Sequence, residues 1–190
     1  VLSGFVIALN YQGKIKSIGH IFNFQARRFL RLYPLHLITL FLFLGIELIK
    51  YLIEAKSGIA ANNQAFSTNN LSSFLQNIFL VQNLMNNHST WNYPSWSISS
   101  EFYTYMVFAF IALLFNKSRF LLVFISLVIS TLSFYYLFEN SMQINHGFFR
   151  CLYSFFLGVI CYNIKATSKL IIPNFFSYLL IGLSVYLICI

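Results

Sequence analysis

The chain has 190 residues, of which 58% are hydrophobic and 8% are charged, whereas soluble domains carry about 25% charged residues. This composition excludes an ordinary soluble enzyme, and continuous apolar runs of about 20 residues predict transmembrane α-helices. The net charge of +8 does not indicate nucleic-acid binding, because the basic residues lie in short connections between apolar segments, as the positive-inside rule leads one to expect.

The first third of the chain predicts two membrane helices joined by a basic connection. Residues 1–11 have the composition of the end of a membrane helix, and residues 12–31 form a basic connection with an interfacial helix running into the next span. Residues 32–52 predict a complete span with Pro34 tolerated near its start, and residues 55–70 form a polar loop.

The next apolar segment, residues 71–84, is too short to cross. About 14 residues fit a re-entrant or interfacial segment better than a span. Further helices are expected at about 96–115, 119–138, 147–164 and 172–190. The fold class is therefore all-α, a polytopic transmembrane helical bundle with about six spans and one re-entrant or interfacial segment. Because the chain starts and stops inside apolar runs, we expect one partial transmembrane domain over residues 1–190, truncated at both ends.

The positions of the basic residues predict the topology. If residues 71–84 do not cross, nine basic residues share one side and Lys50 and Lys56 lie opposite, and if they do cross the division is five against six. The positive-inside rule favours the first arrangement and places the larger group in the cytoplasm. The larger group consists of Lys14, Lys16, Arg27, Arg28, Arg31, Lys117, Arg119, Lys165 and Lys169.

Two arginines in this group have a spacing suited to anion binding. Arg28 and Arg31 are three residues apart and share a helix face. Guanidinium groups make bidentate contacts with phosphate, so a grip on a phosphorylated donor is one interpretation. The alternative is that both are topology determinants that contact anionic lipid.

A second candidate is Glu101, in the first turns of the 96–115 helix and, by the charge count, on the outer side opposite the arginines. Ser97, Glu101 and Tyr105 recur every four residues and line one helix face. The carboxylate could act as a general base, orient a base, or pair with an arginine. Arg150, near the start of the 147–164 helix, could be that partner, or its side chain could snorkel to the interface.

The remaining polar candidates give weaker signals. His36, just inside the 32–52 helix, is the histidine to test first. Cys151, Cys161 and Cys189 lie in apolar runs and are expected to be core residues. No metal-ligand spacing is present, so no metal is expected.

Four segments together resemble the acyltransferase 3 family of membrane proteins. Val1–Ile7, VLSGFVI, resembles its "LSGFxI" helix, and Arg28–Leu35, RFLRLYPL, resembles its "RxxRIxP" element. Trp96–Tyr103, WSISSEFY, resembles its "WSLSxExxFY" element, although Tyr103 follows Glu101 more closely, at two residues, than the tyrosine of that element does. Arg150–Gly158, RCLYSFFLG, resembles its later "R…FxxG" helix. The segments follow the family order and cover nearly the whole chain.

The resemblance implies an O-acyltransferase in the plasma or inner membrane. Such proteins move an acyl group, commonly acetyl, from cytoplasmic acyl-coenzyme A to a hydroxyl of a cell-surface carbohydrate, a lipid-linked glycan or another small acceptor. It implies donor binding by Arg28 and Arg31 and an essential acidic role for Glu101. Acyl-coenzyme A would be a substrate, with no bound cofactor, and membrane lipid would surround the protein.

The resemblance also implies supporting residues and one missing group. Trp96, Ser97, Tyr103, His36 and Arg150 are expected to shape or support the pocket. The family's catalytic histidine would precede the first residue, so we expect this portion alone to be inactive. The alternative function is a polytopic transporter or lipid flippase with an intramembrane glutamate–arginine site.

Overall fold

The computed structural model describes residues 1–58, 62–85, 90–140 and 146–167. Within these residues the chain is helical and contains no strand, which confirms the all-α fold class. The elements are α1 (Leu2–Tyr11), α2 (Ile18–Ser57), α3 (Leu71–Ile78), α4 (Gln82–Met85), a 3-10 turn η1 (Tyr93–Ser95), α5 (Trp96–Leu114), α6 (Arg119–Glu139) and α7 (Gly147–Thr167).

Four helical segments are long and apolar enough to cross a membrane: α2, η1 with α5, α6 and α7. They confirm four of the expected spans with small shifts at their ends. The short α1 occupies the expected end of a first helix, and the span expected at 172–190 lies outside the described residues. Large apolar side chains such as Ile49, Phe120 and Phe138 are exposed on the outside of the bundle, where lipid would cover them.

Helix α2 differs from its prediction at both ends. It is one helix of 40 residues that begins after the N-cap Ser17 and ends at Ser57, before the C-cap Gly58, which has a left-handed backbone conformation. Pro34 therefore lies in the helix interior and not near its start. At 1.5 Å per residue α2 is about 60 Å long, roughly twice the hydrocarbon thickness. The basic residues and Pro34 suggested a boundary because both are common at helix ends, but here the helix continues through them.

Residues 71–84 do not form a span, as predicted. Two short helices, α3 and α4, flank a break at Phe79–Val81. The Val81 amide donates to the Gln76 carbonyl (2.9 Å) and the Leu80 amide to that of Asn77 (3.2 Å), which is the Schellman pattern of a helix C-terminus. Leu80 has a φ of 57° at the position that glycine usually occupies.

Side chains of the neighbouring helices satisfy the carbonyls at this break. From α2, His36 donates to the Asn77 carbonyl (2.9 Å) and Tyr33 to that of Ile78 (3.0 Å). From α5, Ser99 donates to the carbonyl of Leu80, and Tyr103 lies 3.5 Å from that of Phe79. We call this set of four side chains the carbonyl clamp. It joins α2 to α5 through the end of α3.

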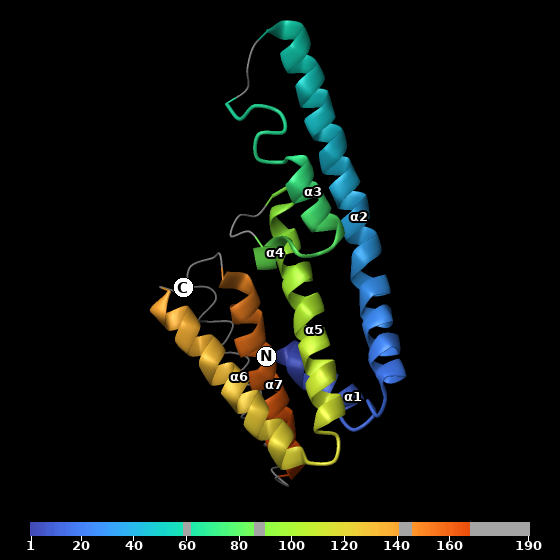
Figure 1. The fold of residues 1–190 in the computed structure, drawn as a ribbon, viewed down its shortest axis with the longest axis vertical. Coiled ribbons are helices and arrows are strands. Elements are labelled where there is room, and N and C mark those ends of the chain that lie inside the picture. Colours follow the sequence, from blue (N-terminus) through green and yellow to red (C-terminus); the bar gives the residue numbers. More distant parts are fainter. Residues whose placement is uncertain (59–61, 86–89, 141–145, 168–190) are drawn as a thin grey trace, which may run out of the picture.

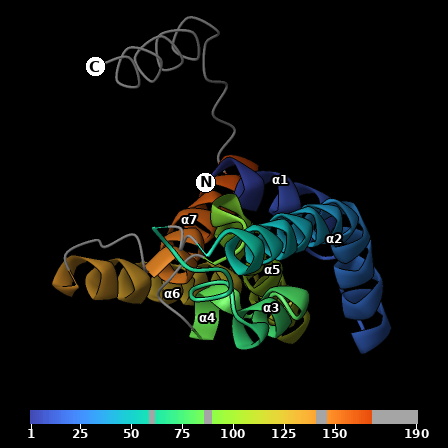
Figure 2. The same ribbon diagram turned by 90° about the horizontal axis from the view of Figure 1, so that it is seen from above.

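The other side of α5 packs against α7, which in turn packs against α1. Figure 2 shows α1 on one side of α5, and α3 and α4 on the other. Helices α1 and α7 cross at two glycines: a Cβ on Gly4 would overlap the Phe155 carbonyl, and a Cβ on Gly158 would overlap the Val1 carbonyl. Both glycines belong to segments that resemble the family. Their physical task is to let two backbones touch.

The connections agree with the predicted topology. The link from α1 to α2, the turn from α5 to α6 and the end of α7 lie together at the lower end of Figure 1. The far end of α2 lies at the opposite end of the molecule. Lys14, Lys117 and Lys165 therefore share one end, with Lys56 opposite, and Lys169 lies outside the described residues.

Candidate functional site

A cavity of about 340 Å³ lies between α1, α2 and α5. Its lining combines apolar residues of α1 with charged residues of the other two helices. The lining residues are Leu2, Ser3, Val6, Ile7, Arg28, Arg31, Leu32, Glu101 and Tyr105. Among these residues the formal charge is +1, from two guanidinium groups and one carboxylate.

The helix geometry places this cavity inside the bundle. Arg28 lies about 15 Å along α2 from its first residue, and Glu101 lies about 20 Å along α5 from its last, at 1.5 Å per residue. Since the start of α2 and the end of α5 lie at the same end of the molecule, the two charges reach similar depth. A cavity lined by charged groups at membrane depth is expensive and usually functional.

The expectation that the arginines and Glu101 lie on opposite faces of the membrane is therefore wrong. It rested on the count of basic residues and on a span that begins at Leu32, with Arg28 and Arg31 on an interfacial helix at the cytoplasmic surface. Because α2 begins at Ile18, both arginines are carried up into the bundle. Helix α5 runs in the opposite direction and carries Glu101 into the bundle, so Arg28, Arg31 and Glu101 line one cavity.

Glu101 is half-buried in this cavity and has one polar contact there. The Tyr105 hydroxyl donates to its Oε2 at 3.2 Å. This confirms the polar face of α5 at these two positions. Within the described part of the chain the carboxylate forms no ion pair, and it lines the cavity.

Arg28 is held by three aromatic rings. Its Cζ lies 5.5 Å from the ring centroid of Tyr11, 5.7 Å from that of Phe24 and 5.6 Å from that of Tyr105. These distances are within the range of cation–π attraction. Its Nε is buried and has no hydrogen-bond acceptor among the described residues. We call the three rings the aromatic cage, and Tyr105 links the cage to Glu101.

Arg31 differs from Arg28, although both line the cavity. Its side chain is exposed, and no ring of the described residues lies over its guanidinium group. Arg27, the third arginine of the sequence cluster, is exposed and does not line the cavity. The three arginines thus have three different environments.

Contacts between α2 and α5 keep this cavity in shape. The Gln25 amide donates to the Phe102 carbonyl at 2.9 Å, and the rings of Phe29 and Phe102 meet edge to face with centroids 5.9 Å apart. Phe29 also stacks on Tyr33 at 4.1 Å. The helix of the arginines and the helix of the glutamate are thereby fixed to each other beside the cavity.

Two other predicted site residues serve the carbonyl clamp and do not line the cavity. His36 is 1% exposed and bonds the Asn77 carbonyl. Tyr103 points to the Phe79 carbonyl. His36 was predicted as the histidine to test first and Tyr103 as a pocket residue through the family resemblance, and in the structure both have backbone carbonyls as acceptors.

The last three predicted site residues also lie outside the cavity lining. Trp96 packs over Gly147, where a Cβ would lie 2.6 Å from the ring, and so fixes the start of α7 against α5. Ser97 is exposed and donates to the Pro94 carbonyl at 3.0 Å. Arg150 is half-buried in the first turn of α7.

Sequence reasoning missed Tyr11, Phe24 and Ser3. Phe24 precedes Arg28 by one helical turn, a spacing that brings side chains together, so this pair could have been found. Tyr11 and Ser3 reach the site only because α1 crosses α7 and lies beside α5, which no local pattern shows.

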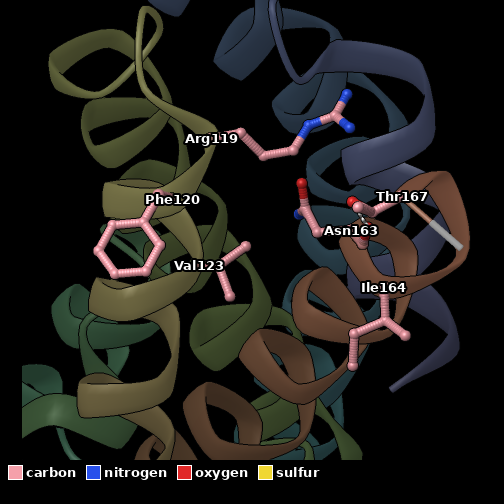
Figure 3. Close-up of a pocket in the computed structure, with 6 residues that line it drawn as sticks. All are labelled: Arg119, Phe120, Val123, Asn163, Ile164 and Thr167. Atoms are coloured by element: carbon pink, nitrogen blue, oxygen red, sulfur yellow. Dashed lines mark hydrogen bonds between the residues drawn. The ribbon is translucent and has the colours of Figure 1, made fainter.

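A larger hollow of about 550 Å³ lies between the start of α6 and the end of α7. Figure 3 shows Arg119 reaching from α6 toward α7, with Asn163 and Thr167 beside it and apolar side chains below. Among the described residues, its lining contains no carboxylate and no histidine. It therefore offers no group that takes up a proton, and the cavity around Glu101 is the better candidate.

The described residues contain no group of three histidine, cysteine, aspartate or glutamate side chains that could hold a metal ion. The side chains of the cavity supply chemistry of their own. They can take up a proton at Glu101 and stabilise negative charge at Arg28 and Arg31.

The fold and the cavity define a polytopic α-helical membrane protein with a charged site inside its bundle. The chain belongs to the acyltransferase 3 family, whose acyltransferase domain matches residues 1–190. It is a membrane acyltransferase by family, and nothing in the match favours the transporter alternative. No curated protein and no solved structure shows significant similarity to the chain.

Proposed function

We propose that this protein is an O-acyltransferase of the cell membrane. It transfers an acyl group, commonly acetyl, from cytoplasmic acyl-coenzyme A to a hydroxyl of a cell-surface carbohydrate, a lipid-linked glycan or another small acceptor. The observation that carries the proposal is that Glu101, Arg28 and Arg31 line one cavity. This reaction needs a base for the hydroxyl proton, which Glu101 can supply or orient. It also needs cations for an anionic donor, which the two arginines supply.

The proposed reaction uses these groups as follows. The acceptor oxygen attacks the thioester carbonyl carbon, and its proton passes to Glu101 or to a base that Glu101 orients. The carbonyl π pair moves to oxygen and gives a tetrahedral oxyanion. When the carbonyl re-forms, the carbon–sulfur bond breaks, and the coenzyme leaves as a thiol after taking up the proton. The arginines supply positive charge to the donor and to the oxyanion.

The test is replacement of the carboxylate by a neutral isostere. Glu101→Gln in the intact protein should lower acyl incorporation into the acceptor by at least about 100-fold, the usual size of a lost acid–base group, while the protein still inserts and accumulates. The measurement is transfer of radiolabelled acetyl groups in membranes of the producing cells.

A matched control is available in α6. Glu139→Gln removes the same group at an exposed position outside the cavity, so transfer should stay within about twofold of the unaltered protein. Near-normal transfer by Glu101→Gln would refute a chemical role for Glu101. Solute movement without covalent acylation would favour the transporter alternative.

A further inference from the structure

We propose that the two cavity arginines have different tasks: Arg31 grips the phosphates of the donor, and Arg28 stabilises the negative charge on the thioester carbonyl oxygen. This inference rests on the proposed acyl transfer and deepens it. It starts from the different environments of two residues that the sequence presents as an equivalent pair.

Arg31 has the features of a ligand-gripping arginine. Its side chain is exposed at the cavity, and in the described residues it has no ion-pair partner. An exposed guanidinium group can rotate to follow a flexible, highly charged donor. It also presents its planar donor fork for bidentate contact with phosphate.

Arg28 has the features of a fixed charge. The aromatic cage surrounds its guanidinium group at 5.5 to 5.7 Å from three ring centroids. Its buried Nε forms no hydrogen bond with any residue that the structure describes. Buried unsatisfied donors are rare and call for an explanation. Here the aromatic cage holds the Arg28 guanidinium group in place, although its Nε makes no hydrogen bond with a described residue.

The cage also fixes the position of Arg28 relative to the Glu101 carboxylate. Tyr105 is at once one wall of the cage (5.6 Å) and the hydrogen-bond donor to Glu101 (3.2 Å). Acyl transfer needs a fixed cation, here Arg28, close to the group that takes up the proton, here Glu101, because negative charge develops on the carbonyl oxygen. Preorganised charge in a water-poor site stabilises a transition state because nothing must reorganise during the reaction.

The tasks can be separated by comparing two donors, acetyl-coenzyme A and acetyl-pantetheine, which has the same thioester but no phosphate. Acetyl transfer to the native acceptor is measured in membranes that carry the intact protein. Arg31→Ala should raise the KM for acetyl-coenzyme A at least about 10-fold with kcat within about threefold. This penalty should disappear with acetyl-pantetheine, because that donor has no phosphate for Arg31 to bind.

Arg28→Lys should give the opposite result. It keeps the charge but loses the planar group that fits between the rings. We expect kcat to fall about 100- to 1,000-fold, the range for loss of one oxyanion donor, with the KM for the donor within about threefold. The fall should be the same for both donors.

The controls guard against a folding defect. Arg27→Ala removes a neighbouring exposed arginine outside the cavity and should leave both parameters unchanged. Should Arg28→Lys fail to accumulate, Tyr11 is the second test: Tyr11→Leu, which removes a cage ring, should lower kcat more than Tyr11→Phe, which keeps it.

Three results would overturn the assignment. The first is a rise in donor KM for Arg28→Lys that vanishes with acetyl-pantetheine, because both arginines would then grip phosphate. The second is an Arg31→Ala penalty that persists with acetyl-pantetheine. The third is equal kcat for the two Tyr11 variants. Absence of transfer by the unaltered protein with either donor would instead overturn the proposed function itself.

Discussion

Two contact regions on opposite sides of α5 hold the bundle together by different means. On one side α1 crosses α7 at Gly4 and Gly158, where the backbones touch. On the other side α3 ends inside the bundle, and the carbonyl clamp donates hydrogen bonds to its last carbonyls. The first region depends on the absence of side chains, and the second depends on their presence.

The difference follows from the cost of unpaired backbone groups in lipid. Regular helices such as α1 and α7 satisfy their own backbone hydrogen bonds, so close approach requires only small residues. A helix that ends inside the bundle leaves its last carbonyls unpaired. Irregular backbone is tolerated at membrane depth only where protein supplies partners, and here α2 and α5, the helices of the cavity, supply them.

The largest expected effect is at the glycine crossing. A Cβ on Gly4 would overlap the backbone carbonyl of Phe155, and backbone atoms cannot move aside as a flexible side chain can. Gly4→Ala should therefore cost more than about 3 kcal/mol, beyond ordinary overpacking. The measurement is the yield and thermal unfolding of the detergent-solubilised protein.

Gly45→Ala is the matched control for this prediction. Gly45 lies within α2, and a methyl group added to its Cα would have no neighbouring atom within 4 Å. Because alanine is the better helix former by up to about 1 kcal/mol, this variant should be neutral or slightly stabilising. Equal loss of stability in both variants would show that helix propensity, and not contact between α1 and α7, controls the result.

The carbonyl clamp should show a smaller effect. Tyr33→Phe and Ser99→Ala each remove one hydroxyl donor with little change in shape, which leaves the carbonyl of Ile78 or Leu80 without that partner. Each should lower the free energy of unfolding by about 1 to 3 kcal/mol, the cost of an orphaned buried polar group. The same thermal unfolding measurement in detergent gives the size of the change.

Ser97→Ala removes a hydroxyl from the same helix as Ser99. Its hydroxyl is exposed and donates only to the local Pro94 carbonyl, so the change should stay below about 0.5 kcal/mol. If Ser97→Ala and Ser99→Ala were equally destabilising, the clamp would not be what stabilises the end of α3.

The fold class, four spans and the non-crossing segment at 71–84 could be predicted from the sequence, because each follows from apolar length. Glu101 could also be chosen because charged groups are rare in apolar helices, and Arg28 because of its spacing from Arg31. Their sharing of one cavity could not be predicted. That depends on where α2 begins, and a basic run followed by Pro34 looks like a boundary although the helix passes through both.

The roles of the other polar residues were equally hidden. In the sequence, His36 and Tyr103 look like site residues. Their actual partners are the carbonyls of Asn77 and Phe79, and no sequence pattern identifies these carbonyls as acceptors. Every residue has a backbone carbonyl that can accept a hydrogen bond. The carbonyls of Asn77 and Phe79 need side-chain donors only because the helix ends between α3 and α4.

The smallest expected effect tests whether the glycine crossing is purely steric. At the end of α1 the amides of Gln12 and Asn163 bond each other reciprocally, at 2.7 and 3.0 Å, and Asn163 is 2% exposed. A double-mutant cycle with Gln12→Ala and Asn163→Ala should give a coupling of about 0.6 kcal/mol, typical of hydrogen bonds between membrane helices. The cycle is needed because Asn163 also donates to the Val159 carbonyl at 2.8 Å, so its single variant loses more than this pair. A coupling indistinguishable from zero would mean that this amide pair does not help to hold α1 to α7, and that the glycine crossing and apolar contacts such as Phe5 against Tyr162 hold the two helices together. A clear coupling would mean that the close-packed contact between α1 and α7 is also stabilised by a side-chain hydrogen bond. That bond lies at the end of α1, where the last backbone carbonyls of the helix lack partners within it.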